Sequence, residues 1–266
     1  MNIIYNLKNP RRALNKLLLV FENFILSKKY NLELYEKKQK EIFNSLNFDR
    51  KKSLQKLIDL KKNINYPVRE MSSEHEIIFS AIASKKKVNK ILEIGTFDGW
   101  NSYLLSKLFP SSQIVTLDLD EKDKNFSKFY NRQDKLNDFI LERDKILKKS
   151  DNIIFRKTNS INMINFKEKY DLIWIDGAHG YPVATIDIVN ALNLVEKEGL
   201  ILCDDVFTQR PINEDEMYRS LASYETLRTF EEQKIIKLFL FYKRLSKKFN
   251  LNPKTRQYIG LVKPLN

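Results

Sequence analysis

The chain has 266 residues, of which 42% are hydrophobic and 12% aromatic, and its formal net charge is +13. This length suits one domain with its own core plus an extension better than two equal domains. No apolar run approaches the roughly 18 residues of a membrane span, because Glu22 and Asn23 interrupt the best candidate at residues 17–26, and we expect no integral membrane protein.

The chain starts with a basic segment followed by apolar residues, as a secretory signal does, but no small-x-small cleavage site comes after it. We therefore expect a cytoplasmic protein. The single Cys203 cannot form an internal disulfide and lies in a predicted strand. It is expected to be a small buried side chain.

Positive charge is concentrated in the two ends of the chain. Residues 1–62 contain 15 Lys and Arg against 6 Asp and Glu, residues 228–266 contain 10 against 2, and the stretch between them contains 22 against 26. A protein acting on nucleic acid more usually has a basic stripe beside its active centre, so a nucleic-acid substrate is not expected. Two interpretations stay open, namely solvated basic faces or a surface that meets anionic lipid or a phosphate-bearing partner.

Residues 11–62 are predicted to be helical. Apolar residues at three- and four-residue spacings form one stripe, made of Leu14, Leu17, Leu18, Phe21, Phe24 and Ile25. Such a stripe more often packs on its own domain, although the basic opposite face keeps peripheral membrane contact open. Ser73 followed by Glu76 is a capping-box pattern and predicts the start of another helix. We expect a basic helical extension over 1–66 and a separate domain over 67–266.

From residue 90 onward, short apolar strands alternate with helices. The strands are predicted at 90–95, 113–118, 152–156, 171–176 and 199–204, and the helices at 100–109, near 124–149 and from Pro182 onward. This alternation predicts a doubly wound, mostly parallel α/β sheet covered on both faces. Residues 237–242 and 257–263 are predicted to add a closing pair of strands.

Ligands in such a sheet bind beyond the carboxyl ends of the strands, so the residues there form a candidate site. The first strand leads into Gly95 and Gly99, which allow a tight turn and close approach of the backbone to a ligand. Phe97 occupies the place where a dinucleotide-binding GxGxxG loop has its second glycine, so a nicotinamide enzyme is a poor candidate. Asp118 ends the second strand and can accept both hydroxyls of a ribose.

Four segments resemble class I S-adenosylmethionine-dependent methyltransferases, in particular the catechol-type and small-molecule O-methyltransferases. They are "ILEIGTFDGWNS", "VTLDLD", "YDLIWIDGAHGY" and "GLILCDDV", in that order along the chain. The resemblance covers roughly residues 70–265 and implies a seven-stranded Rossmann-like fold with S-adenosylmethionine as cofactor. The cofactor residues that it implies are Glu93, Gly95, Thr96, Phe97, Gly99, Asp118, Asn159, Ser160 and Asp176.

In the metal-dependent branch, the matching positions for a divalent ion such as Mg²⁺ are Asp176, Asp204 and Asp205. A bound cation would offset the repulsion among three carboxylates at neighbouring strand ends. Asp205 departs from the catechol-type pattern, which has an amide there, and metal-free relatives have a similar Asp pair. The resemblance therefore leaves the metal open.

The resemblance also implies that His179, with Asp176 and Asp204, is catalytic and takes the proton of the acceptor hydroxyl. The competing interpretation is that His179 caps the helix near Tyr181 and Pro182. We expect O-methylation of a small hydroxylated acceptor such as a sugar, a glycan precursor or a secondary metabolite. Metal-independent O- or N-methylation is the alternative, and a cofactor-binding protein that docks on a membrane or partner is a rival from another class.

Overall fold

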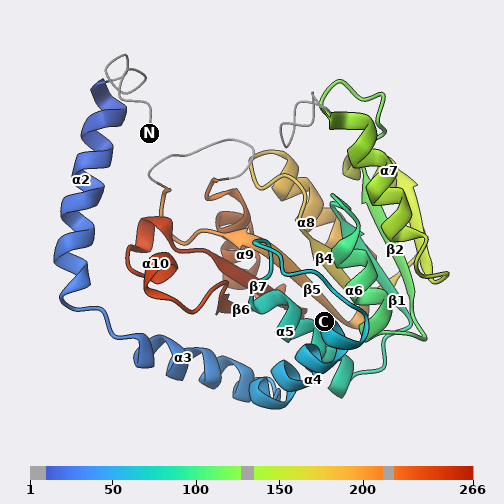
Figure 1. Ribbon diagram of the computed structural model, residues 1–266, viewed down its shortest axis with the longest axis horizontal. Coiled ribbons are helices and arrows are strands. Elements are labelled where there is room, and N and C mark those ends of the chain that lie inside the picture. Colours follow the sequence, from blue (N-terminus) through green and yellow to red (C-terminus); the bar gives the residue numbers. More distant parts are fainter. Residues whose placement is uncertain (1–9, 127–134, 212–218, 266) are drawn as a thin grey trace.

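The computed structural model describes residues 10–126, 135–211 and 219–265, which form a seven-stranded sheet between layers of helices (Figure 1). The strands are β1 (Lys90–Ile94), β2 (Gln113–Asp118), β3 (Ile153–Lys157), β4 (Tyr170–Ile175), β5 (Val195–Val206), β6 (Ile236–Tyr242) and β7 (Tyr258–Pro264). Their order is β3-β2-β1-β4-β5-β7-β6, and only the pairs of β7 with β5 and β6 are antiparallel. The predicted mostly parallel sheet and its closing pair are confirmed.

The helices connect the strands and precede them. They are α2 (Pro10–Ser27), α3 (Leu32–Ser45), α4 (Arg50–Asn63), α5 (Glu74–Lys85), α6 (Trp100–Leu108), α7 (Leu136–Leu147), α8 (Val183–Leu194), α9 (Ala222–Glu232) and the short α10 (Lys247–Asn250), with 3₁₀ turns η3 (Ser160–Asn165) and η4 (Pro253–Thr255). The helix predicted near 124–149 is observed as α7, and residues 127–134 of that range lie outside the described residues. The helix α9 was not predicted.

Each face of the sheet has its own hydrophobic core. In β1, Ile91 packs with residues of α3 to α6, whereas the next residue, Leu92, packs with residues of α8 and α9. This alternation follows from the two-residue period of a strand, and burial of both faces explains why the strands are apolar throughout. Cys203 is 1% exposed in the second core, as predicted for a small buried side chain.

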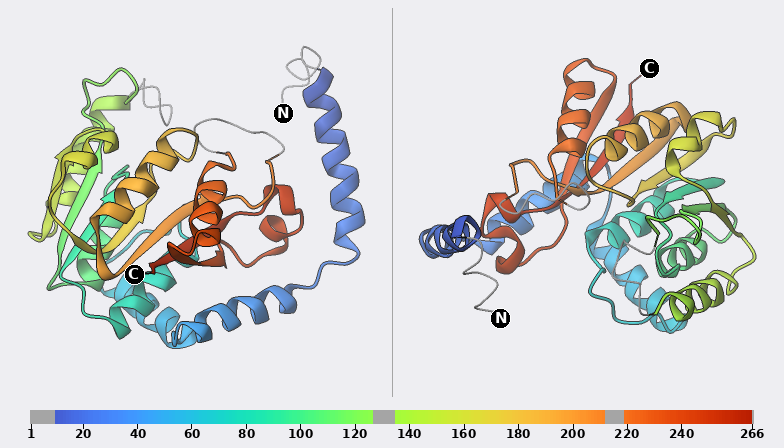
Figure 2. Two further views of the ribbon diagram at one scale, coloured as in Figure 1. Left: turned by 180° about the vertical axis from the view of Figure 1, so that it is seen from behind. Right: turned by 90° about the horizontal axis from the view of Figure 1, so that it is seen from above.

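The helices α3 and α4 belong to the core of the domain. Phe43 on α3 is fully buried and Leu57 on α4 is 3% exposed, and both lie in the core that covers one face of the sheet. The predicted boundary at residue 66 therefore does not separate two cores. The helix α2 stands apart from the sheet, at the edge of the molecule in Figure 1 and in both views of Figure 2.

The apolar stripe of α2 does not pack on its own domain. Its residues are between 47% and 68% exposed, and they include Leu17, Leu18, Phe21 and Phe24. The helix is held near its carboxyl end instead, where Glu22 accepts from Lys254 at 2.8 Å and Asn23 accepts from Asn252 at 3.1 Å. The expectation of packing is wrong for this stripe. Within the described ranges, no helix is long and apolar enough to cross a membrane.

The helix α5 begins where the sequence predicts, but without the capping box. The hydroxyl of the N-cap residue Ser73 bonds with His75 Nδ1, so it does not cap a backbone amide of the helix. Glu76 instead accepts from Lys61 at 2.6 Å and from Ser72 at 3.0 Å. The helix start is anchored by the Glu74 amide, which donates to the Lys243 carbonyl at 3.0 Å.

Candidate active site

Four predicted site residues lie next to one another at the carboxyl edge of the sheet. Ile94 of β1 pairs in register with Leu117 of β2 and with Ile175 of β4, and Ile175 pairs with Cys203 of β5. The residues that follow these four are Gly95, Asp118, Asp176 and Asp204. The parallel register therefore brings together groups that are far apart in the sequence, as expected for a ligand site in this architecture.

The turn after β1 requires glycine at Gly95. Its φ is +99°, and a Cβ atom there would lie 2.3 Å from the carbonyl oxygen of Asp176. Phe97 also adopts a positive φ, of 50°, and its amide donates to Asp118 Oδ2 at 3.0 Å. A non-glycine residue in this region is strained, so the surrounding contacts must hold it. The loop is thus fixed against the strand ends before any ligand binds.

A cavity of about 180 Å³ opens beside this loop. Asp118, Asn159 and Ser160 line it, together with Gly95 and Gly177. Asn159 Oδ1 already accepts from the Ile161 amide at 3.0 Å, so its carbonyl oxygen is used to start η3. A carboxylate at the end of β2 and polar groups after β3 fit the ribose and base of a nucleoside.

A second cavity, of about 220 Å³, lies on the other side of Gly95, which lines both. Its lining includes the predicted residues Asp176, His179, Asp204 and Asp205, together with Thr96 and Phe97. The segment before the first strand contributes Tyr66, Arg69, Met71 and Ser72. The two cavities together have room for a nucleoside on one side of the loop and a reacting group on the other.

Two predicted cofactor residues, Glu93 and Gly99, line neither cavity in the described part of the chain. Glu93 is fully buried behind the loop, where its carboxylate accepts from Asn101 at 2.7 Å, from Thr116 at 2.7 Å and from Ser102. Gly99 has a φ of +79° at the N-cap of α6. Both residues support the loop from behind.

The carboxylates are paired with a lysine that sequence reasoning missed. Lys243 directly follows β6, and its Nζ lies 2.5 Å from Asp204 Oδ2 and 2.6 Å from Asp205 Oδ1. His179 Nε2 lies 3.6 Å from Asp176 Oδ1 and 3.8 Å from Asp205 Oδ2. The His179 side chain therefore faces the cluster, which favours the catalytic interpretation over the helix-capping one.

Asp176, Asp204 and Lys243 shift the pKa values of one another, and the directions of these shifts differ. Burial and the charge of Asp204 raise the pKa of Asp176 well above its usual range. Burial alone would also raise the pKa of Asp204, but Lys243 and His179 outweigh it and lower that pKa. Burial would lower the pKa of Lys243, yet Asp204 and Asp205 raise it above the ordinary value. Lys243 is therefore a charged ammonium at neutral pH.

The cluster does not fit the divalent cation that the metal-dependent relatives imply. The Lys243 ammonium already occupies oxygens of Asp204 and Asp205, two of the three predicted ligands. Within the described residues, no group of three or more His, Cys, Asp or Glu side chains is arranged to hold a metal ion. A hard cation needs several oxygens at short range, and the lysine occupies one oxygen of each of these two carboxylates.

Arg69 is a second residue that the sequence did not single out. Its Nη2 donates to Asp98 Oδ2 at 2.6 Å, while its buried Nη1 has no hydrogen-bond partner among the described residues. A buried guanidinium donor without a partner is costly unless a ligand completes it. Arg69 lines the same cavity as His179 and can receive an anionic group there.

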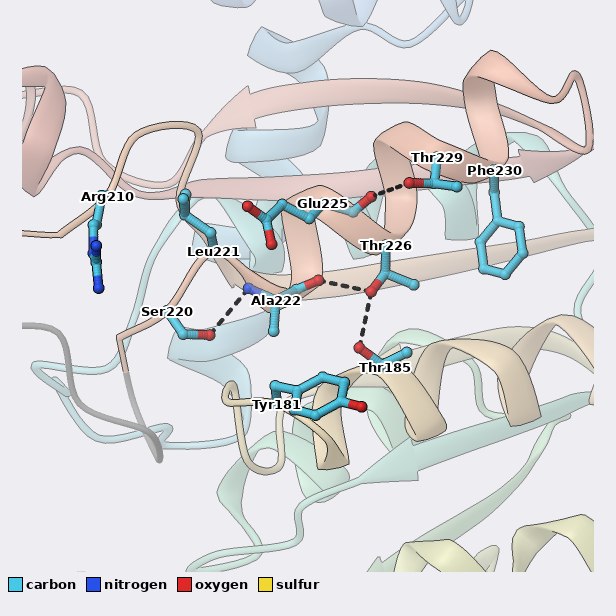
Figure 3. A pocket seen from close by; sticks show the side chains of 10 residues that line it. All are labelled: Tyr181, Thr185, Arg210, Ser220, Leu221, Ala222, Glu225, Thr226, Thr229 and Phe230. Atoms are coloured by element: carbon cyan, nitrogen blue, oxygen red, sulfur yellow. Dashed lines mark hydrogen bonds between the residues drawn. The ribbon is translucent and has the colours of Figure 1, made fainter.

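A further hollow lies outside this cluster, between α8 and α9 (Figure 3). It measures about 660 Å³ and is lined by Tyr181, Thr185, Arg210, Ser220, Leu221, Ala222, Glu225, Thr226, Thr229 and Phe230. None of the predicted site residues lines it. Ser220 connects it to the site, because its hydroxyl donates to the His179 carbonyl at 2.8 Å.

Comparison with known proteins agrees with this geometry. Residues 92–206 match the sequence profile of a family described as Methyltransferase domain, and no curated protein matches the chain. Among solved structures, an O-methyltransferase from Bacillus cereus in complex with SAH is 17% identical, with a TM-score of 0.51, and the match covers 88% of this chain and 100% of that one. Rv0187 from MTB, described as cofactor-bound, is 17% identical, with a TM-score of 0.52 and coverage of 80% and 89%.

A third structure, the SAH-bound methyltransferase PaMTH1 from Podospora anserina, is 18% identical, with a TM-score of 0.50 and coverage of 79% and 88%. At these identities the structures establish the fold, and the family match establishes the kind of domain. Residues 92–206 are a methyltransferase domain, and the chain around them has the fold of the class I S-adenosylmethionine-dependent methyltransferases.

Proposed function

We propose that this S-adenosylmethionine-dependent methyltransferase methylates a hydroxyl oxygen of a small acceptor, with His179 as the general base. The observation that carries the proposal is the position of His179 Nε2, which faces Asp176 and Asp205 in the cavity that meets the nucleoside cavity at Gly95. A carboxylate beside an imidazole stabilises the protonated form that a general base must pass through.

When bound, S-adenosylmethionine supplies a methyl group on a positively charged sulfur. The chain's own residues hold the acceptor hydroxyl and receive its proton at His179 Nε2, while the oxygen forms its bond to the methyl carbon and the carbon–sulfur bond breaks. The products are a methyl ether and S-adenosylhomocysteine, with the proton left on His179. Most of the rate enhancement in such a displacement comes from positioning the two reactants.

The size and lining of the second cavity support a small acceptor. This cavity measures about 220 Å³, and its lining includes Tyr66, Met71 and Ser72 beside the charged groups. These residues precede the first strand of the sheet. A sugar, a glycan precursor or a hydroxylated secondary metabolite fits this mixture of an aromatic ring, apolar groups and hydroxyls. The middle of the chain has more acidic than basic residues, which argues against nucleic acid as the acceptor.

The test is transfer of a radiolabelled methyl group from S-adenosylmethionine to a panel of small hydroxylated and amino acceptors. We expect products among the hydroxylated compounds, and we expect His179→Ala to lower kcat at least about 100-fold, the size of a general-base contribution. Because His179 is outside the nucleoside cavity, affinity for S-adenosylmethionine should stay within about threefold. Full turnover by His179→Ala would overturn the assignment. Products only among the amines would favour N-methylation.

We also propose that the protein is cytoplasmic and contacts anionic membranes through α2. Its exposed apolar stripe supports this, as does the basic excess of residues 1–62, because an amphipathic helix of this kind binds anionic lipid surfaces. The protein should co-sediment with vesicles containing phosphatidylglycerol and not with pure phosphatidylcholine.

The double variant Leu18→Glu/Phe21→Glu should abolish the co-sedimentation. Leu141→Glu, which changes a leucine on α7 that is 68% exposed, is the matched control and should bind as the wild type does. Vesicle binding that both variants retain would show that α2 is not the contact. If the protein bound vesicles and S-adenosylmethionine but transferred no methyl group to any acceptor, a cofactor-binding docking protein would be the better description.

A further inference from the structure

Lys243 is held rigidly in the carboxylate cluster. Its amide donates to the Gln257 carbonyl at 3.0 Å and its carbonyl accepts from the Glu74 amide at 3.0 Å. Its side chain is 8% exposed, and two of its three N–H bonds are directed to Asp204 and Asp205. These backbone and side-chain hydrogen bonds fix the ammonium at one point of the cavity wall, whereas a surface lysine moves freely.

The Lys243 ammonium lies where a positive charge most reduces the repulsion among the three carboxylates. Three buried or half-buried carboxylates from β4 and β5 converge on the cavity, and unpaired they would repel one another strongly at low local dielectric. Lys243 offsets this repulsion from the end of β6, which β7 separates from β5 in the sheet, so the protein needs no added ion to keep the cluster folded. A divalent ion that used Asp204 Oδ2 or Asp205 Oδ1 would have to displace the lysine from that oxygen.

We propose that Lys243 is a built-in cation that takes the place of the divalent metal at this site. It excludes metal from the cluster, and its remaining N–H bond is available to the acceptor oxygen in the cavity that it lines. As the hydroxyl proton passes to His179, the ammonium stabilises the negative charge that develops on the oxygen. This last role rests on the proposed methyl transfer, whereas the exclusion of metal does not.

The exclusion is tested without turnover, by titrating Mn²⁺ into the full-length protein and following it by calorimetry and electron paramagnetic resonance. The wild type should show no saturable Mn²⁺ site at the cluster. Lys243→Ala and the nearly isosteric Lys243→Met should gain at least about tenfold in Mn²⁺ affinity, because the freed carboxylates prefer hard cations. The added substitution Asp204→Asn should remove that gain.

Lys237→Ala is the matched control, because Lys237 lies on β6 itself and is exposed to solvent. This variant should bind Mn²⁺ as the wild type does. A wild-type Mn²⁺ site that Asp204→Asn abolishes would overturn the proposal, and it can be measured even if neither Lys243 variant folds. Folded Lys243 variants that gain no Mn²⁺ affinity would also overturn it, since the lysine would then not be what excludes the metal.

The catalytic role is tested with any acceptor found in the methyl-transfer assay. Wild-type kcat should be the same in EDTA and in Mg²⁺, whereas Lys243→Ala in EDTA should lose at least about tenfold in kcat, the size of one charge-assisted stabilising contact. A wild type that needs Mg²⁺, or a Lys243→Ala variant with full turnover in EDTA, would contradict this role. If no acceptor reacts, the proposed function fails while the Mn²⁺ titration still decides the exclusion.

Discussion

Two buried acidic side chains near the loop after β1 differ in pKa because their hydrogen-bond partners differ in charge. Asp204 is 5% exposed and faces the Lys243 ammonium, which outweighs the effect of burial and lowers its pKa. Glu93 is fully buried among neutral donors, and burial raises its pKa to about 7 although Ser102, Thr116 and Asn101 donate to it. Neutral donors therefore do not replace a cation in keeping a buried carboxylate ionised.

Glu93 should make the stability of the protein depend on pH. Its pKa is about 7 in the folded protein against an ordinary value of 4.5, so the folded state binds this proton more tightly. Its contribution is fully present below pH 4.5 and is lost as the pH rises toward 7, by at most about 1.4 kcal/mol per pH unit. Urea unfolding at several pH values across this range should show a smaller loss for Glu93→Gln than for the wild type. The exposed Glu142→Gln is the control, and an equal loss in all three proteins would contradict the assignment.

At the scale of elements, the sequence predicts the parallel part of the sheet because its strands are short apolar runs, and all but β3 have Gly or Asp at or next to their carboxyl ends. The sequence also predicts the closing strand β6, but no local pattern records the contact that covers its edge. Gln39 of α3 is fully buried, and its side chain donates to the Tyr242 carbonyl at 3.2 Å and accepts from the Tyr242 amide at 2.9 Å. The side-chain amide of Gln39 therefore pairs with backbone groups at the end of β6. Because β6 is an edge strand, these groups would otherwise lack a partner strand.

Docking of α3 on the sheet should account for a large part of the stability. Phe43 is fully buried and stacks edge-on against Phe241 of β6 at 5.0 Å between ring centroids. Phe43→Ala should lower the free energy of unfolding by roughly 3–5 kcal/mol, as expected for a buried phenylalanine that leaves a cavity. Leu34→Ala on the same helix, where the side chain is 47% exposed, should cost less than about 1 kcal/mol. Similar losses for the two variants, measured by urea unfolding, would show that α3 is not docked in this way.

At the scale of the whole molecule, the site combines distant parts of the chain, and this decides how much of it could be predicted. Asp118, Asp176 and Asp204 lie at the carboxyl ends of parallel strands, which share one edge of the sheet, so their meeting could be predicted. Lys243 comes one residue after β6, which reaches the site only through the antiparallel register with β7. That register depends on tertiary packing, which the local sequence does not record. No local sequence pattern distinguishes Lys243 from the other lysines of the chain. The exposure of α2 was missed for the same reason, because a helical pattern does not say what covers its apolar face.

The central claim is that this chain binds S-adenosylmethionine at the carboxyl edge of its sheet, in a site whose charge is balanced by its own lysine. Calorimetric titration of the purified protein with S-adenosylmethionine, in EDTA and again in Mg²⁺, tests it most directly. We predict saturable binding with the same affinity in both buffers, weakened at least about tenfold by Asp118→Asn, which removes the charge facing the ribose. Failure to bind the methyl donor, or binding that requires Mg²⁺, would contradict the account.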